Sequence, residues 1–310
     1  MNARKKIGFF RELRINGLLY LMALPAILLT LVFKYVPMVG ILIAFEDYNP
    51  IKGLFGSQFI GLKNFRYFFR GSKWLQITFN TLFLNVLFII TGTVAAVALA
   101  IMLTEIGKKL FTRVSQSVMI FPNFISWAVV AMFAQTFISS DGGYINRIIE
   151  FFGGSPIGFY STAGIWPLIF VIIRIWKGAG FGAIIYMAAI MGIDGEIYEA
   201  AKIDGASRRQ IIARITVPLL KDTIILLTIL SIGSIFYGDF GMIYTFVGDN
   251  SVLFPTTDVI DTYVFRSLRT SGSTMGMSAA VGLYQSLIGF MLVVAANRLA
   301  KRFSPQSAIF

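Results

Sequence analysis

The chain has 310 residues, of which 56% are apolar and 14% charged, and its formal net charge is +12. It contains no cysteine and no histidine, which excludes disulfides, thiolate and imidazole catalysis, haem axial histidines and the usual zinc sites. The basic charge does not indicate a nucleic-acid partner, because the lysines and arginines are divided among separate segments instead of forming one continuous face.

The apolar residues are gathered in long runs between polar segments, which indicates an integral membrane protein. A helix needs about 20 apolar residues to cross about 30 Å of hydrocarbon. Six runs reach that length and none shows the strict alternation of a barrel strand, so we predict an all-α protein with six transmembrane helices. In chain order these spans are Leu18–Ala44, Ile77–Leu103, Val118–Ile138, Ile165–Met191, Thr223–Phe246 and Ala279–Asn297.

The predicted organisation is a basic N-terminal segment (1–17), one transmembrane domain (18–298) and a C-terminal tail (299–310). The first apolar run is too long for a cleavable signal peptide and is expected to stay as a membrane anchor. If both ends share one side of the membrane, that side carries 16 of the 27 lysines and arginines and the opposite side carries eight. The excess of basic residues predicts that both termini are cytoplasmic.

This orientation defines two longer outer loops. The first, Phe45–Gln76, is rich in aromatic and basic residues and either lies at the membrane interface or contacts an external binding protein. The second, Val247–Ser278, contains Asp249, Asp258 and Asp261, which we predict to be solvated.

Arg174 and Lys177 are charges inside a predicted span, where a charge costs roughly 2.5 to 3.5 kcal/mol and therefore usually faces a bundle interior or a water-filled cavity. Arg174 could bind a sugar carboxylate or hydroxyl groups, and the two cations together favour a uronate-containing oligomer as substrate. The other candidates for the substrate route are polar and aromatic residues of the spans, namely Asn85, Tyr186, Tyr237, Asp239, Tyr284 and Gln285. The alternative role for each is hydrogen bonding between helices.

The glycine-rich segment GAGFG, residues 178–182, lies in the same predicted span. Its G-x-x-x-G spacing permits either close helix packing or local unwinding, and we predict packing.

Residues 194–218, here called the 194–218 loop, form a charged insert between two predicted spans. Asp194 can cap a helix whose first turns are acidic, and Gly205 can end it in the left-handed conformation common past a helix C-terminus. Ser207 and Gln210 have the spacing of a capping box, so a second helix is predicted to start there. The sequence therefore predicts a helix, a sharp bend and a second helix; an ordinary solvated amphipathic loop is the alternative.

The first helix of the 194–218 loop has a flat surface bordered by charge. Ala200 and Ala201 leave little relief, so another protein can approach closely, and Glu199 and Asp204 lie beside them. A membrane protein with such a segment on its cytoplasmic side is expected to bind a soluble partner there. No G-x-x-x-x-G-K-[ST] pattern is present, so any ATP that powers the protein is predicted to bind another subunit, and no metal site is expected.

The 194–218 loop resembles the EAA loop of permease subunits of ATP-binding-cassette importers, whose pattern is E-A-A, three residues, G, nine residues, I-x-L-P. Here the pattern reads Glu199-Ala200-Ala201, Gly205 and Ile215-Thr216-Val217-Pro218, with Val217 in place of the leucine. The segments FEDYNP, GLKNF, DGGYIN and EAAKIDGA resemble the oligosaccharide-importing, maltose-type branch. KYVPMVGILIAFEDYN, RIWKGAGFGAIIYMAAI and DTYVFR are most similar to polysaccharide or aldouronate-type permeases.

The resemblance implies the type I ABC importer permease fold, in which this loop forms a coupling helix that docks on a cytoplasmic ATPase. Glu199 and Asp204 would form polar contacts with the ATPase, and Ala200 and Ala201 would allow it to approach closely. Gly205 would form the turn that transmits force. Pro218 would mark the point where the chain re-enters the membrane, because its missing N–H ends regular hydrogen bonding.

The implied partners are a second homologous permease, two ATPase subunits that carry ATP and Mg²⁺, an extracellular solute-binding protein, the oligosaccharide and membrane lipid, in a bacterial plasma membrane. Importers of the same class for a non-sugar solute, and ion-coupled carriers that use Arg174, Lys177 and Asp239, are the alternatives. A membrane-embedded enzyme is disfavoured, because no carboxylate pair or Ser–Lys pair lies at useful spacing within one segment.

Overall fold

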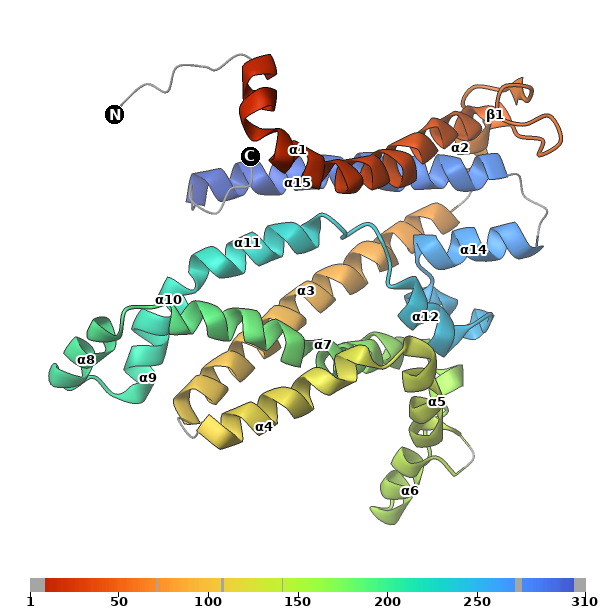
Figure 1. Ribbon diagram of the computed structural model, residues 1–310. Helices are drawn as coiled ribbons and strands as arrows, with labels where there is room; N and C mark the ends of the chain where they lie inside the picture. Colours follow the sequence, from red (N-terminus) through yellow and green to blue (C-terminus); the bar gives the residue numbers. More distant parts are fainter. Residues whose placement is uncertain (1–8, 71, 107–108, 141, 271–274, 304–310) are drawn as a thin grey trace. The chain divides into compact units, whose positions relative to one another are not determined.

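The computed structural model describes residues 9–70, 72–106, 109–140, 142–270 and 275–303 (Figure 1). Residues 1–8 of the N-terminal segment, residues 304–310 of the C-terminal tail and Asp141 of the DGGYIN motif lie outside the described residues. The chain divides into two compact units, which are described separately. Unit 1 comprises Met1–Tyr67 and Ser273–Leu283, and unit 2 comprises Phe68–Gly272 and Tyr284–Phe310.

Unit 1 begins with a long apolar helical stretch, Ile15–Phe45. Its elements are α1 (Phe9–Thr30), η1 (Leu31–Tyr35) and η2 (Val36–Phe45), followed by β1 (Glu46–Asp47), β2 (Gln58–Phe59), α2 (Lys63–Phe69) and the start of α15 (Met275–Phe303). No residue in the most apolar window of this stretch is buried, as suits a helix whose side chains face lipid.

The FEDYNP and GLKNF segments meet at a corner of unit 1. β1 and β2, the only strands among the described residues, pair antiparallel with Glu46 opposite Phe59. The buried Asn64 side chain donates to the carbonyl oxygens of Ala44 and Glu46 at 3.0 and 2.9 Å, and Phe45 stacks on Phe59. Both segments therefore stabilise the chain where it leaves the first span.

Unit 2 is built around two long helices, α3 (Lys73–Ile106) and α7 (Trp166–Met191), which pack along each other (Figure 1). Between them lie α4 (Lys109–Ile120), η3 (Phe121–Phe124), α5 (Trp127–Ile138), α6 (Tyr144–Phe151), η4 (Phe159–Ser161) and η5 (Ala163–Ile165). After α7 come α8 (Gly195–Ile203), α9 (Arg208–Ile211), η6 (Ile212–Thr216), α10 (Val217–Leu219), α11 (Lys221–Ile232), α12 (Phe240–Val247), η7 (Ser251–Leu253), α13 (Phe254–Thr257), α14 (Ile260–Thr270) and the rest of α15.

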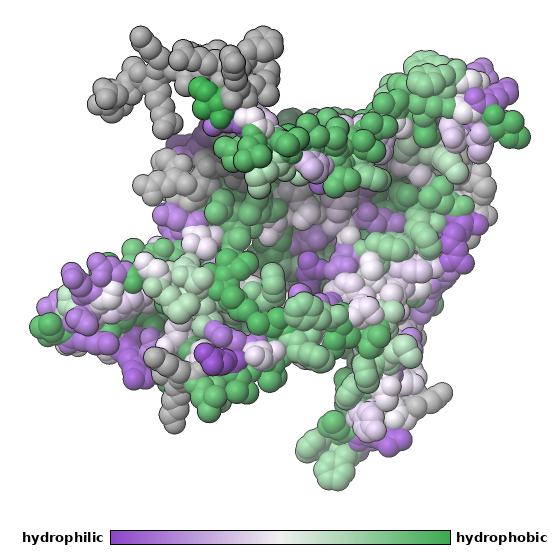
Figure 2. Space-filling view, in the orientation of Figure 1, coloured by the Kyte–Doolittle hydropathy of each residue, from purple (hydrophilic) through white to green (hydrophobic). Residues whose placement is uncertain are grey.

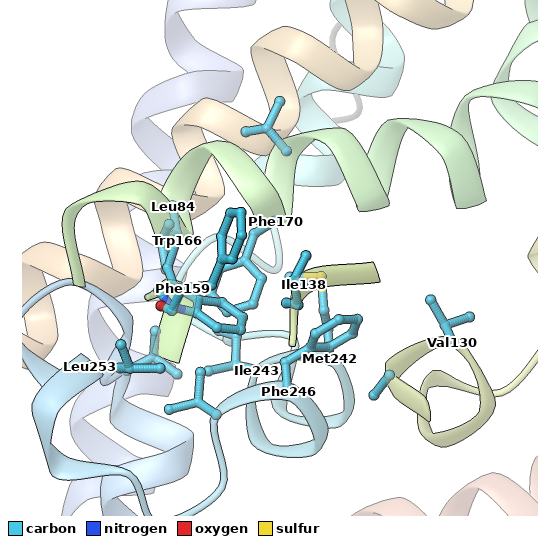
Figure 3. Close-up of a cluster of buried hydrophobic side chains, with 14 of the residues drawn as sticks. Leu84, Val130, Ile138, Phe159, Trp166, Phe170, Met242, Ile243, Phe246 and Leu253 are labelled. Carbon is cyan, nitrogen blue, oxygen red and sulfur yellow. The ribbon is translucent and has the colours of Figure 1, made fainter. Parts of the chain in front are cut away.

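The main apolar core of unit 2 lies where α3, α5, α7 and α12 converge (Figure 3). Trp166 and Phe170 at the start of α7 are fully buried and pack against Phe246 of α12. The indole N–H of Trp166 donates to the Phe159 carbonyl at 2.8 Å, so its one polar group is satisfied inside this core. A second cluster joins α3, α7 and Leu220 around Ala100, Ala183 and Tyr186.

Four of the six predicted spans are confirmed as helical stretches long and apolar enough to cross a membrane, within the part of the chain that the structure describes. They are Ile15–Phe45, Lys73–Ile106, Ala163–Met191 and Met275–Leu299. The other two predicted spans are not single helices: the third contains a sharp bend, and the fifth is divided between α11 and α12. The described residues reach the predicted six spans when each of their two bent helix pairs is counted as one span.

The third span, predicted as continuous over Val118–Ile138, is broken. Leu110–Phe124 and Trp127–Ile138 meet at 98°. Pro122 cannot donate to a preceding carbonyl and lies in the 3₁₀ turn η3, which ends the regular helix. The Ser126 hydroxyl then caps α5 by accepting from the Val129 N–H. The prediction was wrong because it counted apolar length and ignored these two local signals.

The fifth span, predicted over Thr223–Phe246, is also wrong as a continuous helix. α11 ends at Ile232, and residues 233–239 are not helical. α12 is a separate helix capped by Asp239, which accepts from the Met242 N–H at 3.1 Å. In addition, the helices Arg208–Leu219 and Lys221–Ile232 meet at 51°. The membrane passage here is assembled from short pieces, which leaves backbone groups that need partners.

Candidate functional site

A cavity of about 490 Å³ in unit 2, here called the α3–α7 cavity, opens between α3, α7 and α11. Three of the predicted substrate-route residues line it, Asn85 from α3 and Arg174 and Tyr186 from α7. Small residues of the GAGFG segment, including Gly178 and Gly182, form part of the same wall. The small side chains leave the α3–α7 cavity open, and the charged and aromatic side chains lie at its walls.

Arg174 forms an ion pair with Asp239, whose Oδ2 lies 2.7 Å from Nη1 of the guanidinium. Their side chains are 39% and 24% exposed, so the pair lies at the border between the protein and open space. The guanidinium also lies over the Phe88 ring, 4.8 Å from its centroid. Because pairing lowers the cost of a charge in a span, Asp239 stabilises Arg174 in this position.

Arg174 keeps binding capacity within this pair. Among the described residues Asp239 is its only hydrogen-bond acceptor, and a guanidinium has five N–H donors. The remaining donors can bind carboxylate or hydroxyl groups that enter the α3–α7 cavity.

The unwound segment before α12 is held by polar side chains from three other helices. Asn85 of α3 donates to the Tyr237 carbonyl at 3.2 Å, and Gln285 of α15 donates to the Phe236 carbonyl at 2.9 Å. The Gly238 N–H donates to Oδ2 of Asp261 at 2.6 Å. These contacts satisfy backbone groups that a continuous helix would have bonded internally, and they fix the segment that carries Asp239.

The prediction that Asp261 is solvated is wrong, because its partly buried carboxylate accepts from the Gly238 N–H. Burial raises the pKa of its carboxyl, and the Gly238 N–H and the Gln285 amide oppose that shift. Asp258 is likewise not solvated, since it is buried and paired with Arg266. No nearby sequence signal marks these contacts; the Gly238–Asp261 bond joins residues 23 positions apart.

The two remaining tyrosine candidates do not line the α3–α7 cavity. The Tyr237 hydroxyl is 3.1 Å from the Ser286 hydroxyl, and the Tyr284 hydroxyl is 3.4 Å from that of Thr78. Tyr284 also packs against the rings of Phe68, Phe69 and Phe236. The structure thus brings Asn85, Arg174 and Tyr186 together at the cavity, with Asp239 bound to Arg174. Tyr237 and Gln285 are connected to this group through the backbone of the unwound segment. Tyr284 lies in a separate aromatic cluster.

Lys177 stabilises the break in the third span. Its ammonium group donates to the carbonyl oxygens of Pro122, Asn123 and Ile125 at 3.2, 2.8 and 2.6 Å, and lies over the Trp127 ring. An ammonium has three N–H donors, so these bonds use all of them. Lys177 therefore binds the backbone at the bend, whereas the sequence suggested a part in binding an acidic substrate.

We expect Lys177→Met to destabilise the protein by about 1 to 3 kcal/mol, because it removes the donor from three partly buried carbonyl groups while keeping an unbranched side chain. Thermal unfolding of the purified protein in detergent measures the loss. Lys34→Met is the matched control, because it removes another span cation, an exposed one, from the Ile15–Phe45 stretch of unit 1. Equal melting temperatures for wild type and Lys177→Met would contradict the assignment.

The predicted structure of the 194–218 loop is confirmed. Asp194 caps α8 by accepting from the Glu196 N–H at 3.0 Å, and Gly205 adopts a φ of +75° just past the helix end. Ser207 and Gln210 form the capping box that begins α9, with the Gln210 side chain 2.7 Å from the Ser207 N–H. Helix, bend and second helix follow from local side chains alone.

The tip of the 194–218 loop is accessible to a partner. Glu199, Ala200 and Asp204 are exposed, and Figure 2 shows hydrophilic side chains gathered over α8 and α9 at the left of the view. Ile203 projects from the same tip and is 85% exposed. An exposed isoleucine among charged residues suits a protein-binding surface, and it is not part of the E-A-A pattern that marked this loop in the sequence.

Pro218 does not end regular hydrogen bonding as expected. The π-helical turn η6 precedes it, and its wider spacing accommodates the missing N–H, so the helix continues through α10 and bends only near Leu220. The Tyr198 hydroxyl lies 3.3 Å from the Thr216 hydroxyl, which ties α8 to this turn. The first helix of the loop is thus connected to the following helix both through the backbone and through this side-chain contact.

Comparisons with known proteins agree with this architecture. A family model described as "Binding-protein-dependent transport system inner membrane component" matches residues 89–305. The polygalacturonan/rhamnogalacturonan transport system permease protein YteP of Bacillus subtilis (strain 168) is 38% identical over 291 residues, 93% of this chain and 89% of that protein. Protein LplB of the same organism is 37% identical over 306 residues, 99% of this chain and 95% of that protein.

A solved structure is similar throughout. A chain of a bacterial ABC transporter involved in the import of the acidic polysaccharide alginate superimposes with a TM-score of 0.85 at 32% identity, covering 95% of this chain and 99% of that chain. A chain of a bacterial alginate ABC transporter in complex with an alginate pentasaccharide-bound periplasmic protein matches with the same TM-score at 31% identity, covering 96% and 98%.

Proposed function

Because this chain belongs to the family of binding-protein-dependent transport system inner membrane components, we propose that it is the permease subunit of an ATP-driven importer for acidic oligosaccharides. An external binding protein delivers the sugar, and the α3–α7 cavity accepts it on its way to the cytoplasm. The relatives named for polygalacturonan and alginate support an acidic sugar.

One observation carries the substrate class: Arg174 lies in a membrane span, beside a cavity of about 490 Å³, with donors left over after its pairing with Asp239. A cation in a span is costly and is retained where it contributes to function. A uronate carboxylate is the group that complements it, and its two oxygens match the planar guanidinium.

The 194–218 loop supports the proposed coupling to ATP. In this proposal Glu199 and Asp204 contact a cytoplasmic ATPase subunit, Ala200 and Ala201 allow close approach, and Gly205 shapes the bend. Pro218 lies within the helix that connects the loop to α11. ATP and Mg²⁺ bind the ATPase subunits, and a second, homologous permease completes the transport route together with two such ATPases.

Both termini and the 194–218 loop lie on the cytoplasmic side in this proposal, and residues 45–76 and 247–278 on the external side. The distribution of lysine and arginine supports this orientation.

Co-purification and uptake test the proposal together. The tagged chain should bring down an ATPase and a homologous permease, and proteoliposomes with the complex and its binding protein should import oligogalacturonate only when ATP is present. Purification without an ATPase, or uptake that follows an ion gradient in the absence of ATP, would favour the ion-coupled carrier.

We expect Arg174→Gln to lower the initial rate of oligogalacturonate uptake about tenfold or more, since a charge-assisted hydrogen bond contributes about 1.5 to 3 kcal/mol. Uptake of the neutral methyl ester should fall much less. The double variant Arg174→Gln/Asp239→Asn also removes the unpaired carboxylate, so it should recover thermal stability without recovering uptake of the acidic sugar. Unchanged uptake of both sugars by Arg174→Gln would remove the support for an acidic substrate.

A further inference from the structure

A second cavity of similar size, here called the outer pocket, begins at the first residue of α3. It measures about 500 Å³ and shares no lining residue with the α3–α7 cavity. Lys73, at its edge, precedes Asn85 by twelve residues on one continuous helix, which places the two about 18 Å apart along the helix axis. In the proposed orientation the outer pocket lies toward the external side.

The acidic residues of the outer pocket are already paired with arginines. Asp258 is 2.5 Å from Nη2 of Arg266, and both side chains are largely buried. Asp249 is 3.5 Å from Nη1 of Arg269. Lys73 is exposed and has no acidic partner within ion-pair distance among the described residues. Because Arg269, which does not itself line the pocket, pairs with Asp249, Lys73 is the lining charge left without an opposite partner among the described residues, and it is available to an anion.

Aromatic surface accompanies this charge. Phe254 and Tyr263 line the outer pocket, and the Arg266 guanidinium lies 4.0 Å from the centroid of the Phe254 ring. This stacking and the pairing with Asp258 hold the wall of the pocket in one arrangement. A flat ring beside an available ammonium group suits a sugar whose carbon face packs on the ring and whose carboxylate reaches the cation.

We infer that the outer pocket is an entry subsite for a uronate unit of the transported oligosaccharide, with the Lys73 ammonium binding its carboxylate. This inference rests on the proposed function. An oligomer could contact Lys73 first and Arg174 afterwards, because both cavities open beside α3, whereas a single sugar unit is too short to contact both. The outer pocket thus selects for acidic chains before they reach the α3–α7 cavity.

Lys73→Gln tests the inference in the complete transporter, reconstituted with its binding protein. Two readouts are needed: the initial rate of uptake at saturating loaded binding protein, and the concentration of binding protein that half-saturates ATPase stimulation. We expect Lys73→Gln to lower uptake of oligogalacturonate about threefold to tenfold, as befits one partly exposed charged contact. Uptake of the methyl ester and the half-saturating concentration should stay unchanged, and Lys73→Arg should restore uptake.

Lys63→Gln is the matched control, because it removes an exposed lysine of α2 that does not line the outer pocket. The inference would be overturned if Lys73→Gln lowered uptake of oligogalacturonate and of its methyl ester equally. It would also be overturned if Lys63→Gln lowered uptake of oligogalacturonate as much as Lys73→Gln does. A shift in the half-saturating concentration with unchanged maximal uptake would also overturn it and assign Lys73 to docking of the binding protein. A wild-type transporter that imports no oligogalacturonate contradicts the acidic substrate itself, and with it this subsite.

Discussion

Replacing Gly205 with valine is expected to lower ATP-driven uptake about tenfold or more while the amount of protein in the membrane stays unchanged. Gly205 has a φ of +75°, and the hydrogen bonds that end α8 run from the Ala206 N–H to the Ala201 carbonyl and from the Gly205 N–H to the Lys202 carbonyl. This is the Schellman arrangement, which needs the left-handed conformation at that position.

The cost of the Gly205→Val substitution is conformational. A Cβ at Gly205 would meet no atom within 4 Å, so the side chain has space. A residue with a Cβ pays about 1 to 2 kcal/mol for the left-handed conformation, and a β-branched residue is the least tolerant. The bend between α8 and α9 should therefore change shape, and with it the surface that contacts the ATPase.

Gly195→Val is the matched control in the same loop. Gly195 begins α8 without a positive φ and likewise has open space around its Cβ, so valine should be tolerated there. Gly205→Asn should retain more uptake than Gly205→Val, because asparagine accepts the left-handed conformation more readily. Uptake and ATPase activity of the reconstituted complex are the measurements. Loss of membrane insertion before loss of coupling would instead assign Gly205 to folding.

The second large effect is expected at Gly180, where alanine should destabilise the protein by at least about 3 kcal/mol, the upper end of overpacking costs. A Cβ at Gly180 would lie 2.0 Å from the Met119 carbonyl oxygen. The obstruction is backbone, so no side-chain rotation can relieve it. α4 and α7, which pack together in unit 2, would have to separate (Figure 1).

Gly178→Ala is the control for Gly180→Ala, two residues away on the same helix. A Cβ at Gly178 meets no atom within 4 Å, and alanine has the higher helix propensity, so the melting temperature should stay the same or rise slightly. Thermal unfolding in detergent compares the variants. A Gly180→Ala protein as stable as wild type would contradict the prediction, because it would show that α4 and α7 can separate at little cost.

Packing was predicted for the GAGFG segment, and the contact at Gly180 agrees with it. The sequence could not decide which glycine carries the contact, because residues two apart on a helix face different neighbours. Gly182 faces Ala96 of α3, whereas Gly180 faces the backbone of α4.

The importer family was predicted from the motif residues and is confirmed by the family model over residues 89–305. The roles assigned to individual residues stay predictions, and the structure changes the reasons for some of them. Asn85 and Gln285 donate to backbone carbonyl groups, so any contact with sugar would use their remaining polar atoms. Arg174 keeps free donors and is the strongest substrate candidate.

Two kinds of feature could be read from the sequence by itself. Four spans follow from the length and apolarity of continuous runs, since a bilayer imposes that requirement on each segment separately. The caps and bend of the 194–218 loop follow from residues within a few positions of one another, including the Ser207–Gln210 capping box. Both are local properties, so no knowledge of the remaining chain was needed.

Only the tertiary structure decided how the broken spans are stabilised. Pro122 and Ser126 signal a break locally, but the donor that satisfies its carbonyl groups, Lys177, lies more than fifty residues further along the chain. Asp239 meets Arg174 across 65 residues. In hydrocarbon an unpaired polar group is costly, so the backbone groups freed at each break must bind a polar side chain that lies close in space. The order of residues does not specify which side chain that is.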